Sequence, residues 1–250
     1  MIPIILRQIK FHFLFWIYLF FSLIPLLFVI ITQLFNLNKA YVFITSLITR
    51  YWGKYTIFST GSKITIIGKE NLPINKNVCY VCNHQGNFDI PAILGSVNHE
   101  IGFVAKSSLI YFPIVGLWMK FMGCIFINRS NIKESIRTIN KELQTISSGR
   151  PILVFPEGTR SKANNIGMFQ PGTLKMLTKI ENIEVVPLTI VNTYKVFEEH
   201  GRIENENIKL YVHKPIKTSD LSKDEAKIFP EKLKSIIEAP LLLETPLLNK

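Results

Sequence analysis

The chain has 250 residues, enough for one domain of ordinary size together with an appendage. Hydrophobic residues make up 48% of it and the mean hydropathy is +0.24, which is high for a soluble protein and favours a membrane-associated class. The formal net charge of +11 indicates attraction to anionic lipid head groups or an anionic substrate; nucleic acid is not expected, because the basic residues are dispersed and no nucleic-acid-binding motif occurs.

An uncharged stretch near the N-terminus predicts a membrane anchor. Arg7 and Lys10 precede residues 11–38, which include no Asp, Glu, Lys or Arg. The core of this stretch, residues 13–31, would be about 28 Å long as a helix, close to the hydrocarbon thickness of a bilayer. Pro25 lies in its middle and predicts a kink or a break. No small-residue cleavage site follows, so a removed signal peptide is not expected.

Two arrangements of this anchor remain open: one kinked transmembrane helix, or a helical hairpin that dips into one leaflet. A second, partly apolar helix predicted over residues 41–51 is compatible with the hairpin. The flanking charges do not decide between the two, because basic residues lie on both sides of the stretch (Arg7 and Lys10 before it; Lys39, Arg50 and Lys54 after it).

The rest of the chain alternates between strand and helix patterns. Gly61 and Ser62 form a turn, and short β-branched runs then predict strands at 63–68, 77–82, 101–105, 152–154, 185–191 and 208–212. Apolar residues at helical spacing predict helices between them, for example after Ile132. The fold class is therefore α/β, a mixed sheet flanked by helices. We divide the chain into an anchor (1–58), an α/β domain (59–218), and a C-terminal helix with a tail (219–250).

Cys79 and Cys82 form a C-x-x-C pair, a pattern that can bind metal or carry out redox chemistry. In a strand, however, positions three apart point to opposite faces, so the two thiols would not converge. The second pair that a four-ligand zinc site needs is also absent from the sequence, which has three cysteines in all. We interpret both as core residues in a reducing setting and predict no metal site.

His84 and Asp89 follow the predicted strand 77–82 and are the first candidate catalytic residues. Gly86 supplies a turn, and Asp89 with Pro91 suits the N-cap and first turn of a helix that runs through Leu94. A neutral imidazole can take a proton from a hydroxyl while a carboxylate accepts its other ring N–H. A purely structural corner is the alternative, since a single short motif matches by chance.

The segment 109–127 is apolar except for Lys120. Pro113 and Gly116 interrupt it, which predicts a buried or interfacial helix followed by a strand rather than a second membrane span. Lining of an acyl chain and plain core packing remain equally open for it. Near the C-terminus, Ser222 and Glu225 form a capping box that opens a helix, which Pro230 interrupts.

A second polar block, Phe155-Pro156-Glu157-Gly158-Thr159-Arg160, follows the predicted strand 152–154 about seventy positions after the first. Asn-His-Gln-(x)3-Asp followed by this block resembles the glycerolipid acyltransferase family, most closely its 1-acylglycerol-3-phosphate acyltransferases. Residues 123–129, which end in Arg129, and the proline-bearing residues 185–190 are similar to two further blocks of the family, in the same order. The resemblance covers roughly residues 60–215.

The resemblance implies transfer of a fatty acyl group from a thioester to the sn-2 hydroxyl of 1-acylglycerol 3-phosphate, giving phosphatidate. It implies that His84 is the general base and Asp89 its orienting partner, and it assigns the acceptor's phosphate and glycerol to Arg129, Glu157, Gly158, Thr159 and Arg160. Arginine suits this task because its planar fork matches phosphate. A structural role for Glu157 is equally open. Lys106, after strand 101–105, is a further substrate-binding candidate, although a solvated lysine there is ordinary.

The same resemblance implies no bound cofactor; the co-substrate would be an acyl-coenzyme A or acyl-carrier-protein thioester. It also implies association with the cytoplasmic membrane, with the catalytic domain on the cytoplasmic side. Pro171 departs from the family, which often has a basic residue there, so a phosphate contact from that position is not expected. The alternatives are another lysophospholipid or glycerol 3-phosphate as acceptor, or a catalytically dead, membrane-anchored lipid-binding protein.

Overall fold

The computed structural model describes residues 4–74, 77–97, 101–128, 132–143, 149–170, 174, 177, 178, 180 and 182–244. The helices within these ranges are α1 (Ile4–Phe21), α2 (Leu23–Leu34), α3 (Asn38–Thr60), α4 (Asp89–Ser96), α5 (Val115–Phe121), α6 (Ile132–Leu143), α8 (Lys223–Lys227) and α9 (Phe229–Glu244). The strands are β1 (Lys63–Ile67), β2 (Val78–Cys82), β3 (Gly102–Lys106), β4 (Ile125–Ile127), β5 (Ile152–Val154), β6 (Glu184–Val191), β7 (Asn207–Val212) and β8 (Ile216–Lys217).

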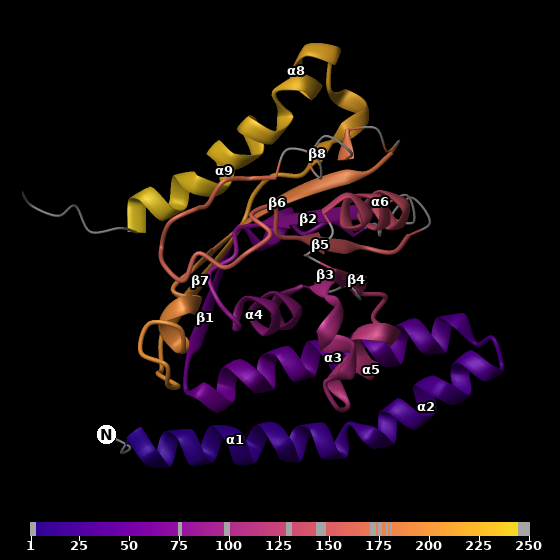
Figure 1. Cartoon of the computed structure of the whole chain (residues 1–250), viewed down its shortest axis with the longest axis vertical. Coiled ribbons are helices and arrows are strands. Elements are labelled where there is room, and N and C mark those ends of the chain that lie inside the picture. The colour runs from indigo at the N-terminus through magenta and orange to yellow at the C-terminus, as the bar shows by residue number, and fades with distance from the viewer. Residues whose placement is uncertain are drawn as a thin grey trace, which may run out of the picture.

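The described strands form a single mixed sheet in the order β1-β7-β6-β2-β5-β3-β4, and β8 pairs with β6 (Figure 1). The run from β6 to β4 is parallel throughout, whereas β7 and β8 are antiparallel to β6. The predicted α/β class with a mixed sheet and an apolar N-terminal helix is therefore confirmed. Parallel strands bring their carboxyl ends to one edge, so the loops after β2, β5, β3 and β4 all leave the sheet there.

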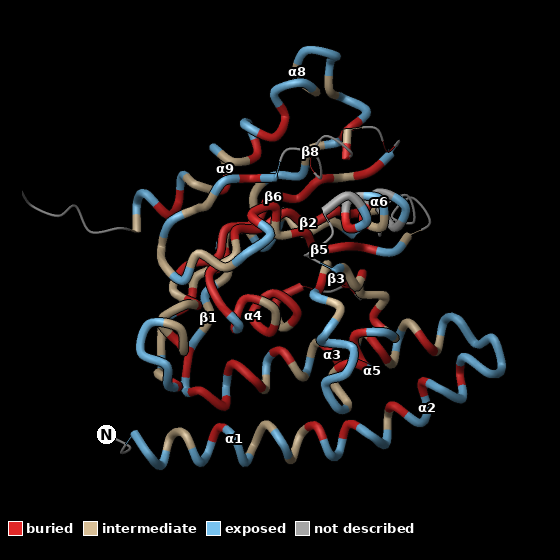
Figure 2. The backbone as a smooth tube through the Cα atoms, viewed as in Figure 1, coloured by how far each residue is buried: buried red, intermediate tan, exposed pale blue. Residues whose placement is uncertain are grey.

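The core lies on both faces of the sheet, as expected for parallel strands covered by helices. Helices α3 and α4 cover one face, and α6 and α9 cover the other (Figures 1 and 2). Strand β2 is buried along its whole length and sends alternate side chains to each core. Cys82 packs in the core on the α3–α4 face and Cys79 in the core on the α6–α9 face, so the two thiols point to opposite faces as predicted.

Helices α1 and α2 follow one another directly and form one bent apolar segment of 31 residues, Ile4–Leu34. Among the described residues, this is the one helical segment long and apolar enough to cross a membrane. The bend falls at Ser22, just before Pro25. A proline ring clashes with the carbonyl four residues earlier, and proline lacks the N–H that would bond to it. Both effects account for a break on the N-terminal side of Pro25. The kink or break predicted from Pro25 is therefore present, and it falls three residues before the proline.

Helix α3 returns along α2 and α1 and then packs against α4. It extends from Asn38 to Thr60, well beyond the predicted range of 41–51. Close approach between α3 and α4 depends on Gly53 and Gly95, because a Cβ at Gly53 would lie 2.5 Å from the backbone nitrogen of Gly95. This contact joins the N-terminal helices to the helix that begins at Asp89.

The remaining elements follow the expected pattern. The segment 109–127 contains a short 3-10 helix (Ser107–Tyr111), α5 and β4, which confirms a helix followed by a strand. The predicted capping box is present, with Ser222 Oγ accepting from the backbone N–H of Glu225 at 3.2 Å, and the helix is interrupted before Pro230 as predicted. Pro171 lies outside the described residues.

Candidate active site

His84 and Asp89 face one another in the loop between β2 and α4. The imidazole Nδ1 lies 2.6 Å from Oδ2 of Asp89. The Asp89 side chain is fully buried, whereas the His84 side chain is 14% exposed. A buried carboxylate on Nδ1 fixes the tautomer that donates from Nδ1 and leaves Nε2 as the free acceptor. The sequence prediction that these residues come together at the carboxyl edge of the sheet agrees with this geometry.

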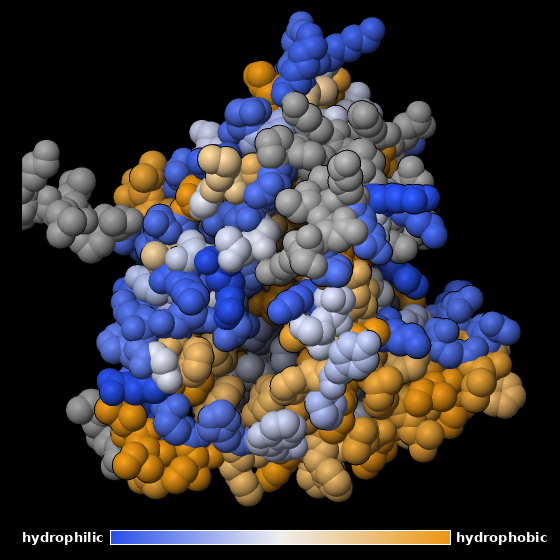
Figure 3. Space-filling model, viewed as in Figure 1, coloured by the Kyte–Doolittle hydropathy of each residue, from blue (hydrophilic) through white to orange (hydrophobic). Residues whose placement is uncertain are grey.

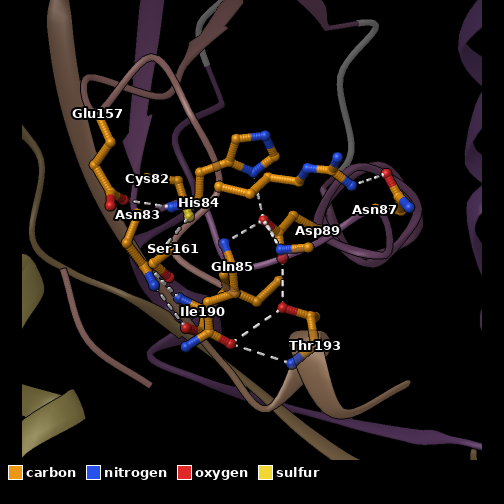
Figure 4. A network of polar contacts seen from close by, with 12 residues as sticks. Cys82, Asn83, His84, Gln85, Asn87, Asp89, Glu157, Ser161, Ile190 and Thr193 are labelled. Carbon is orange, nitrogen blue, oxygen red and sulfur yellow. Dashed lines mark hydrogen bonds and ion pairs between the residues drawn. The ribbon is translucent and has the colours of Figure 1, made fainter. Parts of the chain in front are cut away.

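The carboxylate of Asp89 is surrounded by further donors (Figure 4). Its Oδ2 accepts from the backbone N–H groups of Gln85 at 2.7 Å and Gly86 at 3.0 Å, and its Oδ1 accepts from the hydroxyl of Thr193. The expectation that Asp89 is an N-cap is wrong: Phe88 is the N-cap residue, and the carboxylate bonds to the preceding loop instead of to the first turn of α4. The Asp89 carboxylate therefore holds the loop between β2 and α4 and orients the imidazole at the same time.

The ring of His84 is held from a second side by Phe155, the first residue after β5. The two rings are stacked, with centroids 4.1 Å apart and an angle of 20° between their planes. The loops also exchange backbone hydrogen bonds, since Ser161 N–H donates to the carbonyl of His84 at 2.8 Å and Lys162 N–H to that of Gln85 at 3.1 Å. The two sequence motifs therefore form one rigid corner.

Glu157 joins the same corner through backbone hydrogen bonds. Its Oε1 accepts from the backbone N–H of His84 at 2.7 Å, and its Oε2 accepts from that of Gly167 at 2.6 Å. Burial raises the pKa of this carboxyl, and the two amide donors act in the opposite direction. Because each oxygen already has a backbone partner, the geometry favours the structural role that the sequence left open for Glu157.

Arg160 belongs to the same loop after β5 as Glu157 and contacts the loop that carries His84 and Asp89. Its Nη1 donates to Oδ1 of Asn87 and to Oε1 of Glu198, the latter at 3.0 Å. The arginine side chain is 36% exposed while that of Glu198 is 4% exposed, so a buried carboxylate holds a guanidinium whose tip reaches solvent. Arg160 is therefore tied to the first motif through Asn87 and stays partly exposed.

The other predicted site residues lie along the same edge of the sheet. Gly158 has a left-handed backbone (φ +68°) and forms the turn of the second motif, and both it and Thr159 are exposed. Lys106 ends β3 and is exposed, two strands away from β2 and so about 10 Å along the edge. Strand β4 ends at Ile127, one strand further; Arg129 itself lies outside the described residues.

An apolar cavity of about 60 Å³ lies between the N-terminal helices and the α/β part of the molecule. Its wall includes Val115, Trp118, Met119 and Met122, so α5 serves partly as core and partly as cavity lining. Trp118 closes one side by donating from Nε1 to Oγ of Ser22 at 3.0 Å, at the bend between α1 and α2.

Sequence reasoning missed the contribution of the segment after β6. Asn192 adopts a left-handed backbone (φ +69°) and directs the chain back over the site, where Thr193 bonds to Asp89 and to the Gln85 side chain. Asn83 was part of the motif, but its task was not foreseen: its side chain pairs with both the N–H and the carbonyl of Ile190 and extends the β2–β6 ladder. Nothing in the local sequence marks residues 192–198 as part of a site.

Comparison with known proteins places these features in a family. Residues 63–191 match the family model described as Acyltransferase. The chain is 31% identical over 185 residues to the chloroplastic 1-acyl-sn-glycerol-3-phosphate acyltransferase BAT2 of Brassica napus, covering 72% of this chain and 53% of that protein. It is 31% identical over 160 residues to the 1-acyl-sn-glycerol-3-phosphate acyltransferase of Borreliella burgdorferi, covering 64% of this chain and 63% of the relative.

The aligned part thus spans about half to just under two thirds of these curated relatives. In fold, the structure is similar to the crystal structure of the 1-acyl-sn-glycerophosphate acyltransferase PlsC of Thermotoga maritima, with a TM-score of 0.82 and 24% identity. That similarity covers 99% of this chain and 98% of the other, so the N-terminal helices are included in the shared fold.

Proposed function

This chain belongs to the acyltransferase family, and we propose that it transfers a fatty acyl group from a thioester to the sn-2 hydroxyl of 1-acylglycerol 3-phosphate, making phosphatidate for phospholipid biosynthesis. The observation that carries the proposal is the 2.6 Å contact between His84 and the buried Asp89, with Arg160 in the adjoining loop. The names of the two relatives, both 1-acyl-sn-glycerol-3-phosphate acyltransferases, support the choice of acceptor.

In this proposal Nε2 of His84 takes the proton of the acceptor hydroxyl while the hydroxyl oxygen attacks the carbonyl carbon of the thioester. Asp89 holds Nδ1–H and stabilises the imidazolium that forms. Collapse of the tetrahedral intermediate breaks the carbon–sulfur bond, and the imidazolium returns its proton to the leaving thiolate. The products are an ester and a free thiol, and His84 is neutral again. The stacked Phe155 ring and the backbone bonds around His84 keep Nε2 in place between turnovers.

We assign the acceptor's phosphate to Arg160, with Lys106 at the end of β3 as a further cationic partner and Gly158 and Thr159 near the glycerol. Arg129, which lies outside the described residues, is proposed as another phosphate partner on the family resemblance alone. Glu157 supports the loop through its two backbone contacts. The donor would be an acyl-coenzyme A or acyl-carrier-protein thioester. We propose no bound cofactor and no metal; the described residues include no group of three potential ligands.

We further propose that α1 and α2 attach the protein to the cytoplasmic membrane, with the site on the cytoplasmic side. Large apolar side chains are exposed along both helices, among them Ile5, Phe13, Phe20, Leu27 and Leu34. Figure 3 shows a largely apolar border along the lower edge of the molecule, where α1 and α2 lie. Exposed apolar surface of this extent is typical of membrane contact.

One assay tests the activity. Purified protein is supplied with one labelled acyl thioester and a panel of acceptors: lysophosphatidate, other lysophospholipids, glycerol 3-phosphate and monoacylglycerol. We expect lysophosphatidate to give the highest kcat/KM. A higher kcat/KM for another acceptor would replace the proposed substrate, and no transfer to any acceptor would support the dead lipid-binding protein.

A truncation tests the membrane proposal. Deletion of residues 1–38 should release the protein from washed membranes or leave it aggregating through newly uncovered apolar surface. Activity on bilayer substrate should fall more than activity on dispersed short-chain substrate. If the truncated protein sediments with membranes as the full chain does, α1 and α2 are not the attachment.

A further inference from the structure

We propose that Glu198 is a positioning residue that holds Arg160 for recognition of the acceptor's phosphate. This inference rests on the proposed function, which assigns that phosphate to Arg160. Glu198 lies between β6 and β7, outside both sequence motifs, so it is not one of the residues that the motifs assign to the substrate.

The contacts of Glu198 join the two motif loops at one oxygen. Its Oε1 accepts from the backbone N–H of Asn87 at 2.7 Å and from Nη1 of Arg160 at 3.0 Å. Asn87 Oδ1 accepts from the same Nη1, so this end of the guanidinium is fixed between two acceptors. An arginine has five N–H donors, and the others stay available to a phosphate.

The other oxygen of Glu198 has no evident structural task. Oε2 is buried and has no hydrogen-bond partner among the described residues. It lies close to Gly86, where an added Cβ would be 2.4 Å away, so any larger residue there would displace the end of the Glu198 side chain. An unsatisfied buried carboxylate oxygen is unusual in a structure, and its position beside the site points to a functional reason for keeping it.

The segment that carries Glu198 is fixed at both ends. At its start, Thr193 bonds to Asp89. At its end, the side-chain amide of Gln8 on α1 pairs with both the carbonyl and the N–H of Ile203, each at 2.9 Å, and Arg7 pairs with Glu204. Glu198 therefore reaches Arg160 from a scaffold whose position does not depend on the second motif.

The test is acceptor kinetics with the full chain in lipid–detergent micelles at saturating thioester. Glu198→Ala should raise the KM for lysophosphatidate about 10-fold with kcat within about threefold of wild type, because Arg160 loses the charge-assisted contact that holds it for the acceptor while His84 and Asp89 keep theirs. Glu198→Gln keeps an accepting oxygen and should stay within about threefold of the wild-type KM. Glu199→Ala is the matched control: Glu199 is exposed, its only ion pair in the described chain is with His200, and the KM should not change.

A double variant separates positioning from general damage. If Glu198 acts through Arg160, adding Glu198→Ala to Arg160→Ala should cause no further loss. An unchanged KM in Glu198→Ala, or multiplying losses in the double variant, would overturn the inference. Should Glu198→Ala fail to fold in a thermal scan, Glu198→Asp, which withdraws the carboxylate by one methylene, carries the test: a raised KM supports the role and an unchanged KM refutes it. A wild-type chain that does not acylate lysophosphatidate overturns the proposed function, and this inference with it.

Discussion

Two buried acids flank His84, and their surroundings differ. Asp89 contacts the imidazole itself, while its remaining contacts are loop amides and the Thr193 hydroxyl. Glu157, within the described part of the chain, forms hydrogen bonds only with backbone N–H groups, one of them that of His84. The first acid is placed to stabilise charge on the ring during a reaction, and the second is placed to hold the peptide that carries the ring. Each of the following predictions tests that division of tasks.

The largest effect is expected on the Asp89 side. His84→Ala should lower kcat by about 10²–10⁴-fold, the usual contribution of a general base, and Asp89→Asn should fall in the same range because an amide cannot stabilise the imidazolium. Thermal unfolding of His84→Ala should stay close to wild type, because the Asp89 carboxylate keeps its donors from Gln85, Gly86 and Thr193 when the ring is removed. Near-normal turnover by His84→Ala would end the proposed mechanism.

Arg160 should affect the acceptor and not the base. Loss of one charge-assisted contact to a phosphate costs about 1.5–3 kcal/mol, or roughly 10–100-fold in kcat/KM. Arg160→Ala should show this loss with lysophosphatidate and almost none with monoacylglycerol, and Arg160→Lys should restore only part because a point charge cannot reproduce the fork. Equal proportional losses with the two acceptors would mean that Arg160 shapes the loop and not phosphate binding.

The sequence predicted the strand edge and the His84–Asp89 pair because short apolar runs, turn residues and spacing are local signals. It could not predict Thr193, which meets Asp89 from 104 positions away and depends on the register of β6 beside β2. The roles of Glu157 were left open for a similar reason: its second partner, Gly167, belongs to a loop without periodicity. The bend at Ser22 was predicted from Pro25 for a local reason as well, because a proline acts on the turn before it.

Thr193 provides a milder test of the Asp89 side. Thr193→Val keeps the shape and removes the hydroxyl that donates to Oδ1, so we expect kcat to fall about 10-fold through weaker hold on the carboxylate, with KM nearly unchanged. Thr193→Ser keeps the donor and should restore most of the rate. If the valine and serine variants have the same rate, the hydroxyl has no part in orienting Asp89.

Substitution of Glu157 should mainly lower the free energy of unfolding, whereas substitution of Asp89 should mainly lower kcat. In Glu157→Gln one of the two backbone amides loses its acceptor, because the side-chain nitrogen cannot accept, and the free energy of unfolding should fall by about 1–3 kcal/mol. We expect kcat of the folded variant to drop less than tenfold, in contrast to Asp89→Asn. Glu231→Gln, at an exposed position on α9, is the control in the same urea titration. A loss of rate as large as that of Asp89→Asn, with unchanged stability, would assign Glu157 to the substrate.

The smallest effect is expected at Cys82, which precedes His84 by two residues and is fully buried. Burial raises the pKa of its thiol well above the ordinary value, and the charges of Asp89 and Glu157 raise it further. Because a raised pKa keeps the thiol protonated throughout the usual assay range, Cys82 should not be a nucleophile, and transfer should be direct. Cys82→Ala should therefore keep kcat within about threefold with an unchanged alkaline limb of the pH–rate profile, at a stability cost of about 1 kcal/mol. Reactions quenched before acceptor is added should contain no acyl-protein. A thioester trapped on Cys82 would replace the base mechanism by an acyl-enzyme and give both acids a different task.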